Sequence, residues 1–193
     1  MQKSKFDPQK HHRRSIRIKG YDYSSEGAYY VTIVAWHRDC IFGEIVDGET
    51  ILNNLGRIAD ECWQAIPEHF PFVELGAYVI MPNHVHGIII ITDGGRGAAM
   101  LRPYPRPYDD NSNPHKINVK PGSLGAIVRS YKSAVSYRIH KEYNATGIWQ
   151  RNYYEHIIRD DKDLQNKTDY IIANPSLWDE DDNNPQNNPP SES

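Results

Sequence analysis

The sequence predicts an α+β fold, in which an antiparallel sheet is combined with helices. Short runs of β-branched and aromatic residues alternate with segments whose apolar residues recur at helical spacing. The length of 193 residues suits one sizeable core. The longest apolar run, "GIIII" at 87–91, is far shorter than the ~20 residues needed to cross a bilayer, so no membrane contact is expected.

The first half of the chain predicts three strands and a helix. The segment "AYYVTIVAW" (28–36) is typical of a strand. Residues 52–70 have apolar positions at helical spacing, and this helix is expected to end at Pro67. Two further strands, 72–82 and 84–92, are expected to be joined by a turn at Pro82–Asn83.

The second half predicts a helix, a strand and a last helix. Residues 122–143 carry an apolar stripe formed by Leu124, Ile127, Val128, Tyr131, Val135 and Ile139. Residues 149–160 indicate a short fourth strand. The segment "DDKDLQNKTDYIIANP" (160–175) predicts a helix with Asp160 or Asp161 as N-cap and Pro175 at its end.

The predicted order is therefore β-α-β-β-α-β-α. Its first six elements match the ferredoxin-like βαββαβ arrangement, an antiparallel four-stranded sheet with two helices on one face. The extra C-terminal helix is expected on the open face of the sheet. That face is also where single-stranded nucleic acid commonly binds in such folds.

Composition divides the chain into a folded domain and its margins. Residues 1–20 form a basic segment without the apolar stretch of a secretory signal. Residues 21–178 are the expected domain, with a flexible Gly/Pro/Arg-rich insertion at about 93–121. Residues 179–193 predict a disordered acidic tail. Without the tail's five carboxylates the formal charge changes from −3 to +2, so polyanion binding stays open.

The stretch "MPNHVHGIIII" (81–91) places His84 and His86 at the start of a predicted strand. Residues i and i+2 of a strand share a face, so both imidazoles would project together and could grip one divalent cation, with Val85 turned into the core. A chain with nine histidines contains about 0.4 such pairs by chance, so the spacing alone does not identify a metal site.

The last predicted helix supplies partners for this pair. Tyr170 and Asn174 are four residues apart and therefore share a helical face. Laid over the sheet, they would complete a His–His–Asn site beside a tyrosine nucleophile. The sequence holds thirteen tyrosines, and its chemistry alone leaves three alternatives open, namely Tyr131, Tyr153 and Tyr154.

Five motifs between residues 12 and 178 resemble one family. They are "RRSIRIKGYDYSSEGAYYVTI", "MPNHVHG", "GSLGAIVRSYKS", "IWQRNYYEHIIRD" and "DYIIANP". Together they are similar to the single-tyrosine HUH transposases, where HUH denotes His-hydrophobic-His, and especially to the REP-associated tyrosine transposases. The resemblance implies a metal held by His84 and His86, with Tyr170 as nucleophile and Asn174 as the helix-borne ligand.

The resemblance also implies an enzyme that binds single-stranded DNA hairpins of palindromic repeats. Such an endonuclease and strand transferase cleaves and rejoins DNA through a 5′-phosphotyrosine, as DNA transposition requires. Two histidines and an asparagine favour Mg²⁺ or Mn²⁺ over structural Zn²⁺. A monomer or a homodimer is expected. The two cysteines fit no ligand spacing and indicate a reducing compartment, so the cytoplasm is the expected location.

Expected DNA contacts come from the basic residues. They are Arg13, Arg14, Arg17, Lys19, Arg129, Lys132 and Arg151. A non-catalytic ferredoxin-like module that binds structured DNA or RNA is the alternative function. A metallohydrolase with His-x-His on a strand would need a barrel of ~250 residues, which this chain cannot supply. Whether one chain or a partner's helix completes the site is left open by the sequence.

Overall fold

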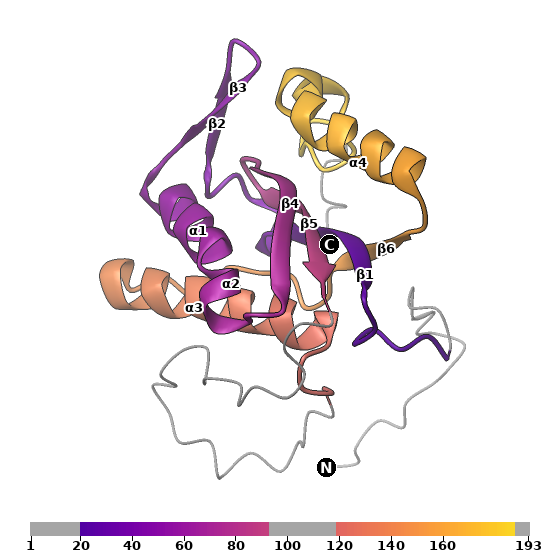
Figure 1. Cartoon of the computed structure of the whole chain (residues 1–193). Coiled ribbons are helices and arrows are strands. Elements are labelled where there is room, and N and C mark those ends of the chain that lie inside the picture. Colours follow the sequence, from indigo (N-terminus) through magenta and orange to yellow (C-terminus); the bar gives the residue numbers. More distant parts are fainter. Residues whose placement is uncertain (1–19, 93–118, 188–193) are drawn as a thin grey trace, which may run out of the picture.

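The structure, a computed structural model, describes residues 20–92 and 119–187. Residues 1–19, 93–118 and 188–193 lie outside the described residues, and with them most of the expected basic segment and insertion. Four strands form an antiparallel sheet in the order β4-β5-β1-β6 (Figure 1). They are β1 (Gly27–Val34), β4 (Val73–Ile80), β5 (His84–Ile91) and β6 (Tyr154–Ile158).

One face of the sheet packs on two helices. The N-cap Asn53 begins α1 (Asn54–Gln64), and Ser123 begins α3 (Leu124–Tyr143), each by accepting backbone N–H groups. The two helices contact each other and cover the main core. Alternate strand residues face them, including Tyr29, Val31, Ile33, Val85 and Ile89.

The opposite face carries α4 (Asp161–Ala173), which Figure 1 shows lying across from α1 and α3. Asp160 is its N-cap and accepts from the N–H of Asp163. A smaller apolar cluster of Tyr30, Ile88 and Ile171 joins α4 to the sheet. The predictions of the last helix, its cap and its place on the open face are confirmed.

Several predicted boundaries were wrong by a few residues. The first helix ends at Gln64 rather than Pro67, because Pro67 occupies the first turn of a separate short helix, α2 (Ile66–His69). Proline is tolerated there, where its missing N–H would have no partner. The strand predicted over 149–160 is confined to Tyr154–Ile158, with Trp149 in an isolated bridge to Ala35.

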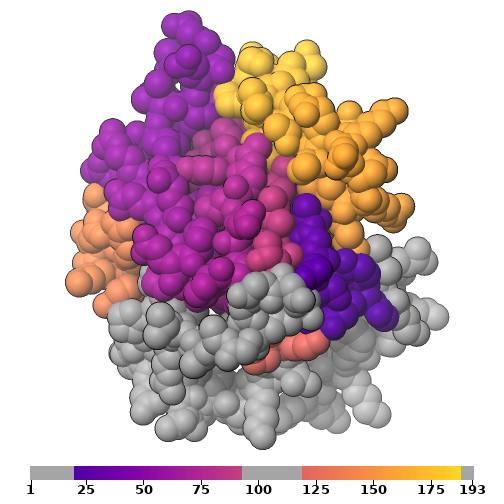
Figure 2. All heavy atoms as spheres, in the orientation of Figure 1, coloured from indigo at the N-terminus to yellow at the C-terminus, as the bar shows by residue number. Residues whose placement is uncertain are grey.

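A hairpin was missing from the predicted elements. Strands β2 (Gly43–Val46) and β3 (Glu49–Leu52) pair with each other outside the main sheet. Asp47 and Gly48 both have positive φ, the conformation that a tight Asp-Gly turn requires. The space-filling view shows the hairpin beside the C-terminal segment, whose 3₁₀ helix η2 (Pro175–Glu180) contacts β3 (Figure 2).

The prediction of disorder from residue 179 is wrong for residues 179–187. Asp181 and Asn184 are buried, and side chains satisfy the backbone here. The N–H of Asn183 donates to Asp181 Oδ1, and Asn184 Nδ2 donates to the carbonyl of Trp178. Disorder was predicted because this segment has few apolar residues to bury. Asp and Asn side chains can nevertheless order a segment by forming turns through hydrogen bonds to the backbone.

Within the two described stretches, no helix has the length and apolar character needed to span a membrane.

Candidate active site

His84 and His86 lie at the start of β5, an inner strand of the sheet that pairs with β1 and β4. Their backbone partners on β1 are Val34 and Thr32, and both imidazoles are buried on the face that carries α4. Val85, between them, belongs to the core on the other face. The expectation that the two imidazoles share a face is therefore confirmed.

The hydrogen bonds of His84 fix which ring nitrogen carries its proton. Nδ1 lies 2.8 Å from Oδ1 of Asn83. The Nδ2 of Asn83 donates to the carbonyls of Arg38 and Asn183, so its Oδ1 must accept. His84 Nδ1 is therefore the donor, and the Nε2 of this ring presents a lone pair.

His86 is held by two hydroxyls. Its Nδ1 lies 2.7 Å from Tyr30 Oη and 2.9 Å from Thr32 Oγ1. Either hydroxyl can donate or accept, so both tautomers of His86 are satisfied and its Nε2 can also present a lone pair. The two Nε2 atoms are 2.9 Å apart, the arrangement of two ligands facing one position.

Burial keeps both histidines neutral. It lowers the pKa of His84 to about 3, a shift that the carboxamide of Asn174 opposes. Burial, and then the neighbouring His84, lower the pKa of His86 well below its usual value. Neutral imidazole is the form that coordinates metal ions, so the ring nitrogens are ready for a cation near neutral pH.

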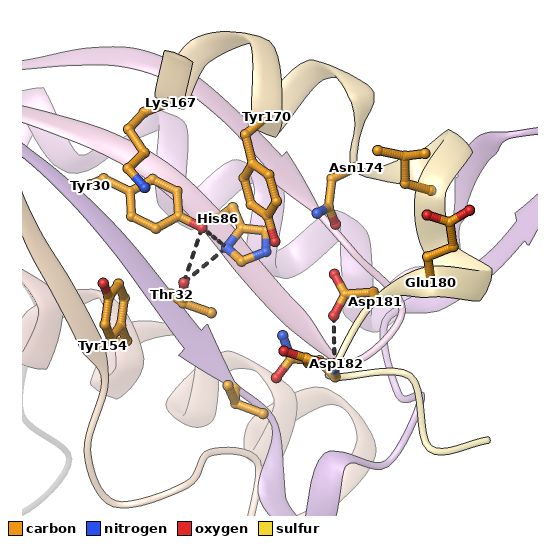
Figure 3. Close-up of a pocket in the computed structure, with 13 residues that line it drawn as sticks. Tyr30, Thr32, His86, Tyr154, Lys167, Tyr170, Asn174, Glu180, Asp181 and Asp182 are labelled. Carbon is orange, nitrogen blue, oxygen red and sulfur yellow. Dashed lines mark hydrogen bonds between the residues drawn. The ribbon is translucent and has the colours of Figure 1, made fainter. Parts of the chain in front are cut away.

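Helix α4 and its C-cap bring Tyr170 and Asn174 beside His86 (Figure 3). The ring centroid of Tyr170 lies 5.3 Å from that of His86, and 43% of the residue is exposed. Asn174 is buried, and its Oδ1 has no hydrogen-bond partner. An unsatisfied amide oxygen beside two imidazoles is a chemically suitable metal ligand.

Asp181 is a functional candidate that sequence reasoning missed, because it falls in the segment predicted as disordered. One carboxylate oxygen, Oδ1, accepts from the N–H of Asn183. The other, Oδ2, is buried without a hydrogen-bond partner and lies 3.8 Å from Nε2 of His84. Ligand atoms of His84, His86 and Asp181 lie within 4.8 Å of one another.

These residues fit a divalent cation. A buried carboxylate is costly unless a positive charge compensates it, and the adjacent histidines are neutral. Two ring nitrogens with one carboxylate and one amide oxygen form a mixed N/O set of the kind that binds divalent cations. All four residues come from one chain.

A pocket of about 620 Å³ opens beside His86 and is lined by α4, β1 and the C-terminal segment. Lys167 lies one turn before Tyr170, and its Nζ is 5.0 Å from the ring centroid of Tyr30. Tyr154 lines the other side and contacts Tyr30 at its edge. The pocket is large enough for a group well beyond a single ion.

The alternative tyrosines are placed differently. Tyr131 is buried against Trp63 on the far side of the sheet and donates to the carbonyl of Ala59. Tyr153 packs against the main core. Tyr154 shares the pocket with Tyr170, but its ring contacts Tyr30, whereas Tyr170 also contacts His86.

The expected DNA contacts are dispersed. Arg129 is exposed on α3, and Arg151 is exposed next to the bridge at Trp149. Lys132 directs its ammonium to the carbonyls of Gln150 and Asn152. The other four expected contacts, Arg13, Arg14, Arg17 and Lys19, lie outside the described residues.

Comparisons with known proteins give a consistent result. No protein-family model matches the chain. An uncharacterised protein of Haemophilus influenzae is 42% identical over 178 residues, covering 92% of this chain and 96% of that protein. A second protein of that organism, named "Putative REP-associated tyrosine transposase", is 28% identical over 154 residues, covering 80% of this chain and 73% of that protein.

A solved structure of a REP-associated tyrosine transposase bound to a REP hairpin has the same fold. The TM-score is 0.56 at 17% identity, covering 86% of this chain and 74% of that one. The chain therefore belongs to one family with the Haemophilus influenzae protein that it matches at 42% identity, and its resemblance to the REP-associated tyrosine transposases is confirmed.

Proposed function

We propose that this protein is a metal-dependent tyrosine HUH transposase that cleaves and rejoins single-stranded DNA beside a hairpin. The observation that carries this proposal is the contact of Tyr170 with His86, whose ring centroids lie 5.3 Å apart, while Nε2 of His86 faces Nε2 of His84. A phenol and a set of metal ligands thus meet in one pocket, although about ninety residues separate them in the sequence.

The arrangement of the sheet supports a ferredoxin-like fold of the HUH type. The four strands, taken in chain order, have the spatial order second-third-first-fourth, and all neighbours are antiparallel. Two helices cover one face, and α4 brings the nucleophile to the other. The transposase with the shared fold was solved with a REP hairpin, which supports a DNA hairpin as the partner.

The phenol of Tyr170 needs help to attack a phosphate. A free tyrosine with a pKa near 10 is about 0.1% phenolate at pH 7. Burial raises the pKa of Tyr170, as does the nearby negative charge of Asp181, whereas Asn174 lowers it. If Asp181 held a cation, its carboxylate charge would be compensated and would no longer contribute to the raised pKa of Tyr170.

His84, His86, Asn174 and Asp181 are the residues that would hold Mg²⁺ or Mn²⁺. The cation would stabilise negative charge on a phosphate oxygen as the reaction proceeds. Tyr170 would supply the nucleophile and Lys167 a second positive charge at the pocket rim. Tyr30 and Thr32 hold the ring of His86 in place, so this imidazole would need little reorganisation to coordinate a metal ion.

The proposed reaction exchanges one phosphodiester for another. Tyr170 Oη forms a bond to phosphorus and loses its proton, while the bond from phosphorus to the 3′-oxygen breaks and that oxygen leaves as a 3′-hydroxyl. The 5′-phosphate stays on Tyr170. A second 3′-hydroxyl can reverse the step and join a new strand without ATP, as transposition requires.

Covalent trapping tests this function. Labelled hairpin DNA with single-stranded flanks, taken from beside the gene, is incubated with protein and Mn²⁺ and separated under denaturing conditions. The unaltered protein should form a denaturant-resistant adduct, and Tyr170→Phe should bind the DNA without forming one. Tyr154→Phe, which alters a second tyrosine of the same pocket, is the matched control and should keep the adduct.

The outcome also separates the alternative function. A protein that binds hairpins but forms no adduct with Mn²⁺ or Mg²⁺ would be a non-catalytic binding module. An adduct that persists in Tyr170→Phe and disappears in Tyr154→Phe would move the nucleophile to β6. Either result contradicts the proposed role of Tyr170.

A further inference from the structure

A second, smaller pocket lies at the end of β1 and includes Arg151, one of the expected DNA contacts. The short 3₁₀ helix η1 (Trp36–Arg38) and the loop 150–152 form it. Its lining residues are Trp36, His37, Gln150, Arg151 and Asn152. Trp36 is 48% exposed, whereas tryptophan usually buries most of its surface. An indole, an imidazole, a guanidinium and two carboxamides therefore surround one open pocket.

Helix η1 and the loop 150–152 are held together by backbone contacts. Ala35 and Trp149 form an antiparallel bridge, the N–H of Trp36 donates to Ile148, and the N–H of Gln150 donates to Val34. Beneath the loop 150–152, Lys132 donates to the carbonyls of Gln150 and Asn152. The pocket is thus a supported feature of the fold rather than a loose gap between loops.

Helix η1 is unusual because His37 and Arg38 both have positive φ, at 54° and 62°. Left-handed conformation is uncommon for residues other than glycine, and such strain persists where surrounding contacts hold it. Those contacts lead to the active site. The carbonyl of Arg38 accepts from Asn83, the residue that orients His84, and Arg38 Nη1 donates to the carbonyl of Asp182.

The pocket is also close to the candidate metal ligands. Val34 is the strand partner of His84, and Trp36 follows it by two residues. With about 3.3 Å per residue along a strand and about 5 Å between strands, the Trp36 and His84 backbones lie roughly 8 Å apart. A short stretch of single-stranded DNA that enters the active site can reach this distance.

We propose that this pocket binds one unpaired nucleobase of the DNA strand, stacked on the indole of Trp36, with Arg151 at the adjoining phosphate. An exposed aromatic ring offers a stacking surface to any base, and arginine pairs with phosphate oxygens. The carboxamides of Gln150 and Asn152 can hydrogen-bond to a base edge and so supply preference among bases. This inference rests on the proposed function and adds a specificity subsite to it.

The test locates the base by removing it. A fluorescein-labelled DNA hairpin with a short unpaired tail is prepared as a series in which one tail nucleotide at a time is abasic. Affinity is measured by fluorescence anisotropy in the Tyr170→Phe background, so that binding is separated from cleavage. Trp36→Ala, Trp36→Phe and Arg151→Gln are compared, and Ile51→Ala, another exposed apolar residue, is the control.

The Tyr170→Phe protein without further changes, called the parent below, should bind the DNA about fivefold or more weakly when one particular tail position is abasic. This matches the usual contribution of base–aromatic stacking. Trp36→Ala should bind the intact tail correspondingly weaker and be insensitive at that position, while Trp36→Phe should recover part of both. Arg151→Gln should lower the salt dependence of binding by about one phosphate contact. Ile51→Ala should behave as the parent.

A Trp36→Ala protein with the parent's abasic profile would overturn the subsite, even where the unaltered protein forms its covalent adduct. A parent that binds no hairpin would overturn the subsite and the proposed function together. If the Tyr170→Phe parent shows the expected abasic profile but the unaltered protein forms no covalent adduct, the subsite is supported and the proposed catalysis is refuted. As a control for folding, the thermal unfolding temperature of Trp36→Ala should equal that of the parent.

Discussion

At the scale of single residues, the candidate site depends on which polar atoms are satisfied and which are not. Asn83 fixes the proton of His84, and Tyr30 and Thr32 support His86. By contrast, Oδ1 of Asn174 and Oδ2 of Asp181 are buried without hydrogen bonds. Buried polar atoms are nearly always paired, so two unpaired oxygens beside two neutral imidazoles favour a cation as their partner.

Asp181→Asn should weaken Mn²⁺ binding about tenfold or more. A charge pair at 4 Å contributes about 4 kcal/mol at an effective dielectric constant of 20, and each 1.4 kcal/mol is tenfold in affinity. Isothermal titration calorimetry of the protein without DNA measures the effect, and Asp182→Asn, on the exposed neighbouring carboxylate, is the control.

The same variant should be more stable than the wild type in the absence of metal. The amide keeps the acceptor for the N–H of Asn183 and removes an uncompensated buried charge. Equal Mn²⁺ affinity in Asp181→Asn and the wild type would remove Asp181 from the ligand set.

The metal-free protein should lose stability as the pH falls from about 6.5 to 4.5. An unfolded histidine binds a proton near pH 6.5, whereas burial lowers the pKa of His84 to about 3 and that of His86 in the same direction. The unfolded state therefore holds more protons in this window, and the free energy of unfolding rises with pH.

Urea unfolding at several pH values measures this slope. Replacing His84 and His86 together by Gln should flatten it between pH 6.5 and 4.5, and His140→Gln, on the exposed end of α3, should not. An unchanged slope in the double variant would mean that other groups take up the protons.

The sequence predicted the histidine half of the site and missed part of the rest. The period of two along a strand fixes the face of His84 and His86, and the period of the helix does the same for Tyr170 and Asn174. Asp181 lies just after the 3₁₀ helix η2, where no helix or strand periodicity predicts the direction of its side chain. Its place depends on turns built by Asp and Asn side chains, and composition alone classed that segment as disordered.

At the scale of elements, β5 has to fit between two layers. Its Gly87 lies directly above the indole of Trp63 on α1, where an added Cβ would come within 2.2 Å of Trp63 Cζ2. Because Gly87, next to His86, has no side chain, α1 can pack closely against β5, the strand that carries the two histidines. Sequence patterns predicted the strand and the helix, with the helix end misplaced by a few residues, but contacts between layers have no local sequence signal. The hairpin with its Asp47–Gly48 turn was not predicted.

Gly87→Ala should destabilise the protein by about 1–3 kcal/mol, the usual cost of overpacking a core. Trp63→Leu should also destabilise it, by opening a cavity. The double variant should be less destabilised than the sum of the two, because the smaller side chain makes room for the methyl group. Thermal unfolding of the four proteins measures this coupling, and strict additivity would contradict the contact.

At the scale of the whole molecule, the fold separates packing from chemistry. The main core and the helices α1 and α3 occupy one side of the sheet, and the candidate site with α4 and the C-terminal segment occupies the other (Figure 1). The formal charge of −3 conceals a basic N-terminal segment and an acidic end. The acidic end contributes Asp181 to the site, and we expect the basic N-terminal segment to contact the DNA phosphates.

Replacing Arg13, Arg14, Arg17 and Lys19 by Gln should therefore weaken hairpin binding mainly through its salt dependence. Each lost phosphate contact lowers the slope of log K against log salt by about 0.7–0.9, so four contacts lower it by roughly three. Sequence preference should persist, because phosphate contacts position a protein without reading bases. The control is Arg57→Gln with Lys141→Gln, two exposed cations on the helices of the opposite side, which should leave the slope unchanged. Equal slopes for the N-terminal variant and the wild type would assign hairpin binding to the folded domain alone.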